Sequence, residues 1–294
     1  MSKRKKLRSM LQGDKIIVAP GVYDAIGAKL VEKIGFDAVY LTGFGCTASF
    51  LGKPDLGLIT LTELVTHAKN IDNAVTIPVI ADCESGFGNA LNAARAIREY
   101  EKAGAAALHI EDQVVPKRYK PDGMPQVVSM EEHANKIKSA VEARTDKDLV
   151  IIGRTDALGR YGLKEAIKRG NAYFEAGCDM IFVHGPQTVD ELKTISREIS
   201  APQIVNYSTI IESGNKPILS TVELEDLGFK LVIFPSILLF TAARIMKDAL
   251  REFKDTGKLT HHSEEMVSIA EFKEILCWDT FAGDEKKYLP GMEK

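Results

Sequence analysis

The chain has 294 residues, of which 45% are hydrophobic and 27% are charged, and its formal net charge is −3. This length and apolar content predict one large α/β domain spanning 1–294. The nearly balanced charge argues against a nucleic acid partner, and no apolar run approaches the ~20 residues of a membrane helix. No apolar run follows the basic residues 3–6 as in a signal peptide, and the four cysteines lack disulfide or zinc spacing. We therefore predict a reduced, cytoplasmic protein.

Short apolar runs alternate with amphipathic helical patterns along most of the chain. We predict eight strands, at 16–19, 38–41, 79–81, 106–110, 149–152, 180–183, 203–205 and 231–234. Helical patterns follow them, for example at 24–33, 90–103, 131–143, 164–176, 189–199 and 221–227. Gly35, Gly104 and Gly177 stand where three of these helices end, as a left-handed cap requires. Eight such β-α units favour a TIM barrel over an open doubly wound sheet.

Two segments depart from this repeat. Residues 114–128 follow the fourth strand and are rich in Pro, Lys and Gly, and a loop of this length in a compact domain is usually functional, often as a lid. Two further helical patterns, at 237–256 and 263–280, come after the eighth strand. Because no strand is left to partner them, these C-terminal helices must pack on the barrel or on a neighbouring subunit.

Acidic residues end two neighbouring predicted strands. Asp82 and Glu84 follow the third strand, and Glu111 and Asp112 follow the fourth. The carboxyl ends of parallel strands meet at one edge, so we expect these carboxylates to lie together and to need a cation or raised pKa values. Hard oxygen ligands without a His or Cys pattern indicate Mg²⁺, with Mn²⁺ as an alternative. Each acid taken alone could instead cap a helix.

Polar groups that suit an anionic substrate follow four other strands. Thr42 precedes the Gly43-Phe44-Gly45 turn, whose amides could form an anion nest. Arg154 ends the fifth strand and could bind a carboxylate in a bidentate manner or form a salt bridge to the acidic cluster. His184 ends the sixth strand and Asn206 the seventh, and either could equally be a satisfied structural polar group.

The predicted lid and the remaining histidines complete the candidates. Basic residues of the loop could close over an anionic substrate, or could belong to a solvated loop: they are Lys117, Arg118 and Lys120, with Tyr119 between them. The other histidines are interpreted as surface residues on or between helices: His67, His133, His261 and His262.

Several motifs, in order along the chain, resemble the phosphoenolpyruvate mutase/isocitrate lyase superfamily over nearly the whole length. They are Tyr40-x-Thr42-Gly43, Gly52-x-Pro54-Asp55, Asp82-x-Glu84-x-Gly86-x-Gly88-Asn89, Glu111-Asp112-Gln113, Pro116-Lys117-Arg118 and Arg154-Thr155-Asp156. The resemblance implies a TIM-like barrel with a gating loop after the fourth strand. It also implies chemistry at a C–C or P–C bond next to a pyruvate enolate that the metal stabilises.

The resemblance also implies roles for particular residues. Mg²⁺ would be held by Asp82, directly or through water with Glu84 and Glu111. The residues that would bind an α-oxocarboxylate are Tyr40, Thr42, Gly43 and Phe44 of the first motif, together with Arg154. Members of the family often form tetramers that exchange C-terminal helices, so a homotetramer with exchanged helices is expected here.

Departures from the family pattern bear on the reaction. The carbon–carbon lyases carry a Cys in the gating loop as proton donor, whereas Tyr119 stands in this region. The lyases also place Glu at the end of the sixth strand, where His184 resembles the phosphoenolpyruvate mutases and phosphonopyruvate hydrolases. In contrast, Asn206 and the helix at 131–144 resemble carboxyphosphonoenolpyruvate mutase and dimethylmalate-type lyases.

Three hypotheses follow. The first is a Mg²⁺-dependent phosphonomutase acting on a phosphonate or α-oxocarboxylate, in which Lys117, Arg118 and His184 steady the phosphoryl-type group and Asp55 holds or relays it. The second is a C–C lyase or hydrolase of a 2-hydroxy diacid or oxaloacetate, in which Tyr119 donates the proton. The third is a barrel that binds a dicarboxylate without turning it over.

Overall fold

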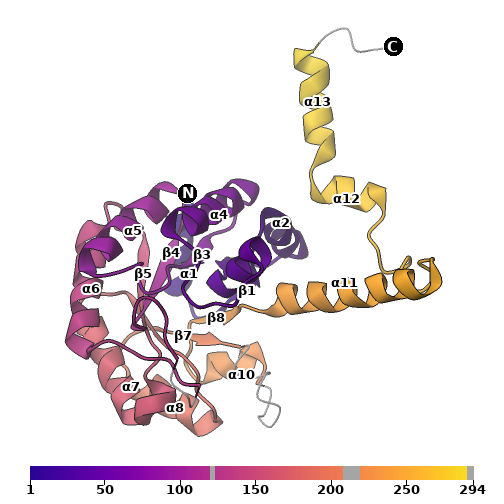
Figure 1. Ribbon diagram of the computed structural model, residues 1–294. Helices are drawn as coiled ribbons and strands as arrows, with labels where there is room; N and C mark the ends of the chain where they lie inside the picture. The colour runs from indigo at the N-terminus through magenta and orange to yellow at the C-terminus, as the bar shows by residue number, and fades with distance from the viewer. Residues whose placement is uncertain (120–122, 208–218, 290–294) are drawn as a thin grey trace.

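Eight parallel strands form a closed barrel in chain order, with β1 paired to β8 (Figure 1). The computed structural model describes residues 1–119, 123–207 and 219–289. The strands are β1 Ile17–Val22, β2 Val39–Leu41, β3 Val79–Asp82, β4 Ala107–Glu111, β5 Val150–Thr155, β6 Met180–Val183, β7 Gln203–Asn206 and β8 Leu231–Phe234. The prediction of a TIM barrel is confirmed.

Helices surround this barrel and close its amino-terminal end. They are α1 Lys3–Leu11, α2 Ala25–Ile34, α3 Gly43–Cys46, α4 Leu61–Ala74, α5 Ala90–Lys102, α6 Met130–Ala143, α7 Leu158–Glu175, α8 Val189–Glu198 and α10 Thr221–Asp226, with a short π-helix at Thr47–Leu51. Gly35, Gly104 and Gly177 have φ values of 100°, 97° and 104°, which confirms the left-handed conformation predicted at the helix ends. A non-helical Gly162 (φ 79°) divides α7, so the predicted helix at 164–176 follows a kink that separates it from a short first segment.

The core has two main layers because strand side chains point alternately inward and outward. Inside the barrel lie Tyr40, Ile80, Phe182 and Ile204, and Leu7 of α1 packs against this layer. A second layer fills the space between the barrel and the outer helices. Apolar burial of this extent stabilises a fold by roughly 1.5–3 kcal/mol per large side chain. A rigid barrel therefore supports the loops at the carboxyl ends of its strands.

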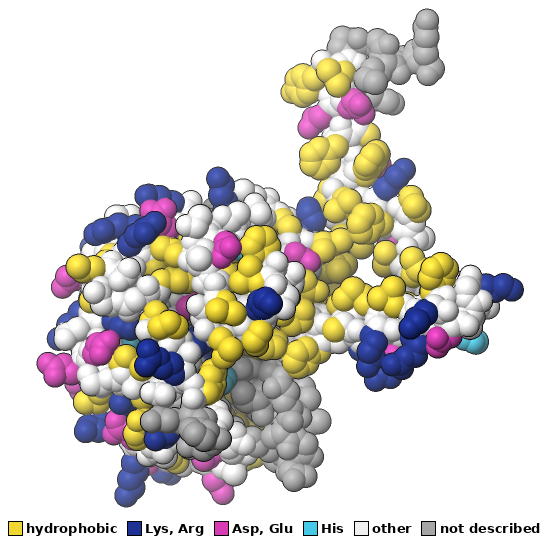
Figure 2. Space-filling model, in the orientation of Figure 1, with side chains coloured by type: hydrophobic (Ala, Val, Ile, Leu, Met, Phe, Trp, Pro, Cys, Tyr) yellow, Lys and Arg dark blue, Asp and Glu magenta, His cyan; other side chains and the backbone are white. Residues whose placement is uncertain are grey.

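The C-terminal helices form an arm (Figure 1). They are α11 Ile237–Thr256, α12 Ile269–Ile275 and α13 Trp278–Tyr288, so the second predicted pattern forms two helices rather than one. In this arm α11 leaves the barrel, and α12 contacts α2 through buried Ile275 and a 3.1 Å ion pair between Lys33 and Glu274. The helix α11 buries none of its residues, and Figure 2 shows apolar side chains along the arm. None of the described helices has the length and apolar character needed to cross a membrane.

Candidate active site

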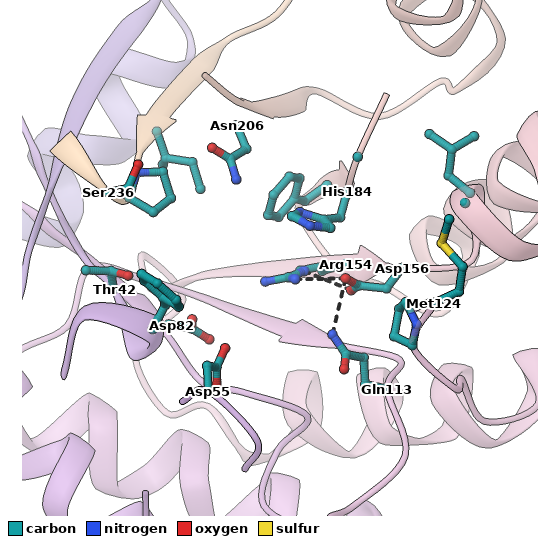
Figure 3. A pocket seen from close by; sticks show the side chains of 18 of the residues that line it. Thr42, Asp55, Asp82, Gln113, Met124, Arg154, Asp156, His184, Asn206 and Ser236 are labelled. Carbon is teal, nitrogen blue, oxygen red and sulfur yellow. Dashed lines mark hydrogen bonds and ion pairs between the residues drawn. The ribbon is translucent and has the colours of Figure 1, made fainter. Parts of the chain in front are cut away.

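A cavity of about 700 Å³ opens at the carboxyl ends of the strands, a size that suits a small-molecule ligand (Figure 3). It forms there because all parallel strands of a barrel end on the same side. Nine of the residues proposed from the sequence line it: Tyr40, Thr42, Phe44, Asp55, Asp82, Tyr119, Arg154, His184 and Asn206. The structure thus brings together side chains separated by up to 166 positions in the sequence.

Buried carboxylates lie around the Lys117 ammonium beside this cavity. Lys117 Nζ is 2.7 Å from Glu84 Oε2, 3.2 Å from Glu111 Oε1 and 3.0 Å from both carboxylate oxygens of Asp55. The side chains of Glu84 and Glu111 are almost inaccessible to solvent, and their carboxylate oxygens accept no hydrogen bond. Their negative charge is therefore balanced by ion pairs alone.

This burial changes the protonation of the acidic cluster. Burial raises the pKa of Glu84 well above its usual range and that of Glu111 to about 7, although Lys117 opposes both shifts. Burial acts in the opposite direction on Lys117, but the surrounding carboxylates raise its pKa well above the usual value. Glu84 and Glu111 therefore bind a proton at higher pH than exposed carboxylates do, even with the Lys117 ammonium beside them. Within the described ranges, no three His, Cys, Asp or Glu side chains are arranged to hold a metal ion. At the acidic cluster, the Lys117 ammonium lies between the carboxylates.

Asp82 is held by its neighbours at the end of β3. Its carboxylate accepts hydrogen bonds from the Gly43 amide (3.2 Å) and the Glu84 amide (2.9 Å). A Cβ atom at Gly43 would lie 2.5 Å from Glu84 Oε1, so only glycine allows this approach. His109, for which the sequence predicts no role, lies 2.7 Å from the Tyr40 hydroxyl and 3.7 Å from Asp82 Oδ1. Its position opposite Asp82 in the β3–β4 register is the signal that could have indicated it.

Arg154 lies between the acidic cluster and the far side of the cavity. Its guanidinium donates two hydrogen bonds to Asp156, at 2.9 and 2.8 Å, and lies 3.1 Å from Glu111 Oε2. Burial alone would raise the pKa of Asp156, but Arg154 holds it well below its usual range. Burial and Arg154 lower the pKa of His184 to about 4, so this imidazole is neutral at pH 7. Gln113, which was not predicted, donates to Asp156 at 3.3 Å and lines the cavity (Figure 3).

The predicted gating loop folds back over the cavity. Backbone bridges join Gln113 to Val127 and Tyr119 to Pro125, while residues 120–122, including Lys120, lie outside the described residues. Lys117 is buried, Arg118 is exposed and does not line the cavity, and Tyr119 lines it. Burial raises the pKa of Tyr119, so its phenol is protonated at neutral pH.

Two interpretations from the sequence are wrong. Asp112 does not join the other acids, because its carboxylate accepts hydrogen bonds from Thr155, Tyr173 and Arg169 on the outer side of the barrel. His133 is not a surface residue, since it is fully buried beside the Tyr173 ring. Adjacent strand residues face opposite sides of a sheet, which places Glu111 and Asp112 on different sides.

A closed barrel with acids, an arginine and a loop lysine gathered at the carboxyl ends of its strands has the architecture of a barrel enzyme. The profile of the phosphoenolpyruvate phosphomutase family matches residues 7–254. The chain is 41% identical to 2,3-dimethylmalate lyase of Eubacterium barkeri, over 99% of this chain and 100% of the relative. It is 37% identical to the chloroplastic carboxyvinyl-carboxyphosphonate phosphorylmutase of Arabidopsis thaliana, over 96% of this chain and 84% of the relative.

Solved structures agree with these sequence relatives. A phosphonopyruvate hydrolase in complex with oxalate and Mg²⁺ superposes with a TM-score of 0.90 at 29% identity, covering 98% of this chain and all of the other. The chain belongs to the phosphoenolpyruvate phosphomutase family, within the phosphoenolpyruvate mutase/isocitrate lyase superfamily that its motifs resemble. Because its relatives are named lyases and phosphomutases, it is an enzyme of this superfamily.

Proposed function

We propose that this enzyme is a carbon–carbon lyase that cleaves an alkyl-substituted 2-hydroxy diacid into a 2-oxo acid and a carboxylic acid. The observation that carries the proposal is the apolar wall of the cavity formed by Met124, Pro125 and Leu158. In Figure 3, Met124 lies across the cavity from Thr42 and Asp82, with Arg154 between the two sides. A substrate with charged groups at one end and alkyl groups at the other matches this division.

The charge of the cavity wall supports the same proposal. Among the described residues that line it, Arg154 is the only Arg or Lys, and His184 is neutral at pH 7. A phosphonate dianion that also carries a carboxylate would demand more positive charge from this wall than a dicarboxylate does. The 41% identity to a 2,3-dimethylmalate lyase points in the same direction.

We assign Mg²⁺, or Mn²⁺ in its place, to the carboxylates of Asp82, Glu84 and Glu111. The support is the donor set itself, since these are buried hard oxygens, and those of Glu84 and Glu111 are engaged, among the described residues, only in ion pairs with Lys117 and Arg154. Lys117 must withdraw from Glu84 for a metal ion to bind at that oxygen. A bound divalent cation supplies positive charge for the oxygens of the reacting substrate.

We assign the two proton transfers of the reaction to Asp55 and Tyr119. Asp55 lines the cavity and is assigned to accept the proton of the substrate 2-hydroxyl as the C2–C3 bond breaks. The bonding electron pair moves to C3, where it is delocalised into the adjacent carboxylate. The protonated phenol of Tyr119 then donates the proton that completes the new carboxylic acid. Arg154 holds one substrate carboxylate by charge-assisted hydrogen bonds.

A phosphonomutase reaction is the second candidate. It is favoured by His184, which lines the cavity near Arg154 and Asp156, and by the 37% identity to a phosphorylmutase. In that reaction Lys117 and His184 would steady the migrating group while Asp55 holds or relays it. Arg118 would assist only if the loop moves, since its side chain does not line the cavity.

Pyruvate release coupled to lactate dehydrogenase, with Mg²⁺ present, tests the proposal. We expect pyruvate from 2,3-dimethylmalate, with a kcat/KM about 10-fold or more above that of 2-methylmalate, because the apolar wall binds the additional methyl group. Leu158→Ala should reduce this ratio. Pyruvate from phosphonopyruvate alone, or a changed phosphorus NMR spectrum without pyruvate, would instead support P–C bond chemistry.

We also propose that the arm pairs with other copies of this chain in a homotetramer. Its exposed apolar side chains support this, among them Leu250 (69%), Phe253 (55%), Ile269 (77%) and Phe281 (69%). Exposed apolar surface of this extent on a projecting helix is unusual for an isolated chain.

A further inference from the structure

Asp112 is surrounded by hydrogen-bond donors although it does not line the cavity. Its Oδ2 accepts hydrogen bonds from Thr155 Oγ1 (2.7 Å), Tyr173 Oη (2.8 Å) and an Arg169 amino group (3.0 Å). Its Oδ1 accepts the Asp156 backbone amide at 2.9 Å. Asp112 is fully buried, and Arg169 is 6% exposed. A buried carboxylate with four donors keeps each of them in a defined position.

One of these donors belongs to a residue that is also hydrogen-bonded to Arg154, on the substrate-binding side of the barrel. The Asp156 amide fixes the residue whose carboxylate receives both hydrogen bonds from Arg154. The Arg154 guanidinium is thereby oriented so that its remaining amino group lies 3.1 Å from Glu111 Oε2. Hydrogen bonds thus connect Asp112 to Arg154 through Asp156.

Asp112 is also connected by hydrogen bonds to the base of the predicted gating loop. The loop leaves β4 next to Asp112 and returns at Val128, whose amide donates to the Asp112 carbonyl at 2.9 Å. The Val128 carbonyl accepts a hydrogen bond of 2.9 Å from the same Arg169 amino group that contacts Asp112. Both backbone groups of Val128 are therefore held by the Asp112–Arg169 pair.

We propose that Asp112 and Arg169 form a positioning pair that sets the Arg154 guanidinium and the base of the 114–128 loop at Val128 together. The proposal rests on the proposed function in assigning Arg154 and the loop to substrate binding. Neither member of the pair touches the cavity, so its effect is transmitted through Asp156 and Val128.

Three variants separate the two effects. Asp112→Asn places an amide nitrogen against a donor, so it should loosen both Asp156 and the loop base. Arg169→Met removes the hydrogen bond to the Val128 carbonyl but leaves the Asp156 amide bonded to Asp112, so it should affect mainly the loop. Glu165→Gln is the matched control, because Glu165 accepts from Arg169 Nε at 2.9 Å without contacting Asp112.

Two readouts do not depend on turnover. The first is the rate of trypsin cleavage after the exposed Arg118 in the native protein, and the second is the affinity for oxalate in the presence of Mg²⁺, measured by calorimetry. For Asp112→Asn we expect cleavage to accelerate by about 10-fold and oxalate to bind about 10-fold more weakly, since small misplacements of binding groups are costly. Arg169→Met should accelerate cleavage with a smaller change in oxalate affinity, and Glu165→Gln should match the wild type.

Thermal unfolding of each variant distinguishes positioning from stability alone. A lower midpoint for Asp112→Asn, with the wild-type cleavage rate and oxalate affinity well below that midpoint, would overturn the proposal. If Asp112→Asn does not fold, the proposal is tested on Arg169→Met. Trypsin cleavage of Arg169→Met at the wild-type rate would equally overturn the proposal. Failure of the wild type to cleave any diacid would count against the proposed function only, because neither readout requires catalysis.

Discussion

Replacing His133 should reduce the dependence of stability on pH. His133 lies on α6, is fully buried and packs edge-on against the Tyr173 ring, with ring centroids 4.5 Å apart. Burial, together with the positive charges of Lys136 and Arg169, lowers its pKa to about 3. In the unfolded chain the pKa returns to about 6.5. The unfolded state therefore binds a proton in acid that the folded state excludes.

The magnitude follows from these two pKa values. The stability that the neutral ring contributes is fully present above pH 6.5 and is lost as the pH falls toward 3. Between pH 7.5 and pH 5.0 this single group costs the folded state about 2 kcal/mol in the free energy of unfolding. Burial also lowers the pKa of His109 and of His184 to about 4, so both add to the acid sensitivity of the wild type.

Urea unfolding at pH 7.5 and pH 5.0 measures this contribution. We expect the wild type to lose about 2 kcal/mol more between the two values than His133→Gln does, whatever the offset between the proteins at pH 7.5. The control is His261→Gln, which removes an exposed histidine and should leave the pH dependence unchanged. Equal pH dependence in the wild type and His133→Gln would show that the buried ring titrates normally and would refute the reasoning.

Three further predictions concern catalysis, the metal and the arm. Tyr119→Phe should lower kcat of the lyase reaction about 10²–10⁴-fold with little change in KM, as expected for loss of a proton donor; full activity in steady-state kinetics would exclude that role. Glu84→Gln should weaken Mg²⁺ binding in calorimetry, and chelation should abolish wild-type activity until Mg²⁺ is restored; activity that survives chelation would contradict the metal assignment. Leu250→Glu with Phe253→Glu should shift sedimentation toward smaller species by charging the apolar face of α11, and an unchanged distribution would argue against assembly through the arm.

The repeating pattern of the sequence was sufficient to predict the barrel, because period-2 and period-3.6 patterns reflect local geometry. It was also sufficient to predict most of the cavity wall, since residues that follow parallel strands necessarily meet at one end of a barrel. Asp82, Arg154 and His184 line the cavity for this reason. His133 was missed although its spacing from the buried Ile137 and Ala140 is that of one helix face. Its polar character outweighed that signal.

Other features depended on tertiary structure. Lys117 reaches Asp55, 62 positions away, only because the loop at 114–128 folds back over the strand ends. Glu111 and Asp112 are adjacent in the sequence but serve different clusters, because the strand turns one carboxylate inward and the other toward Arg169 of α7. The chain itself determined which chemical groups stand at the strand ends. Which of them face the cavity, and with which partners, was decided by how the loop and α7 pack against those ends, since such contacts between distant residues leave no local periodicity.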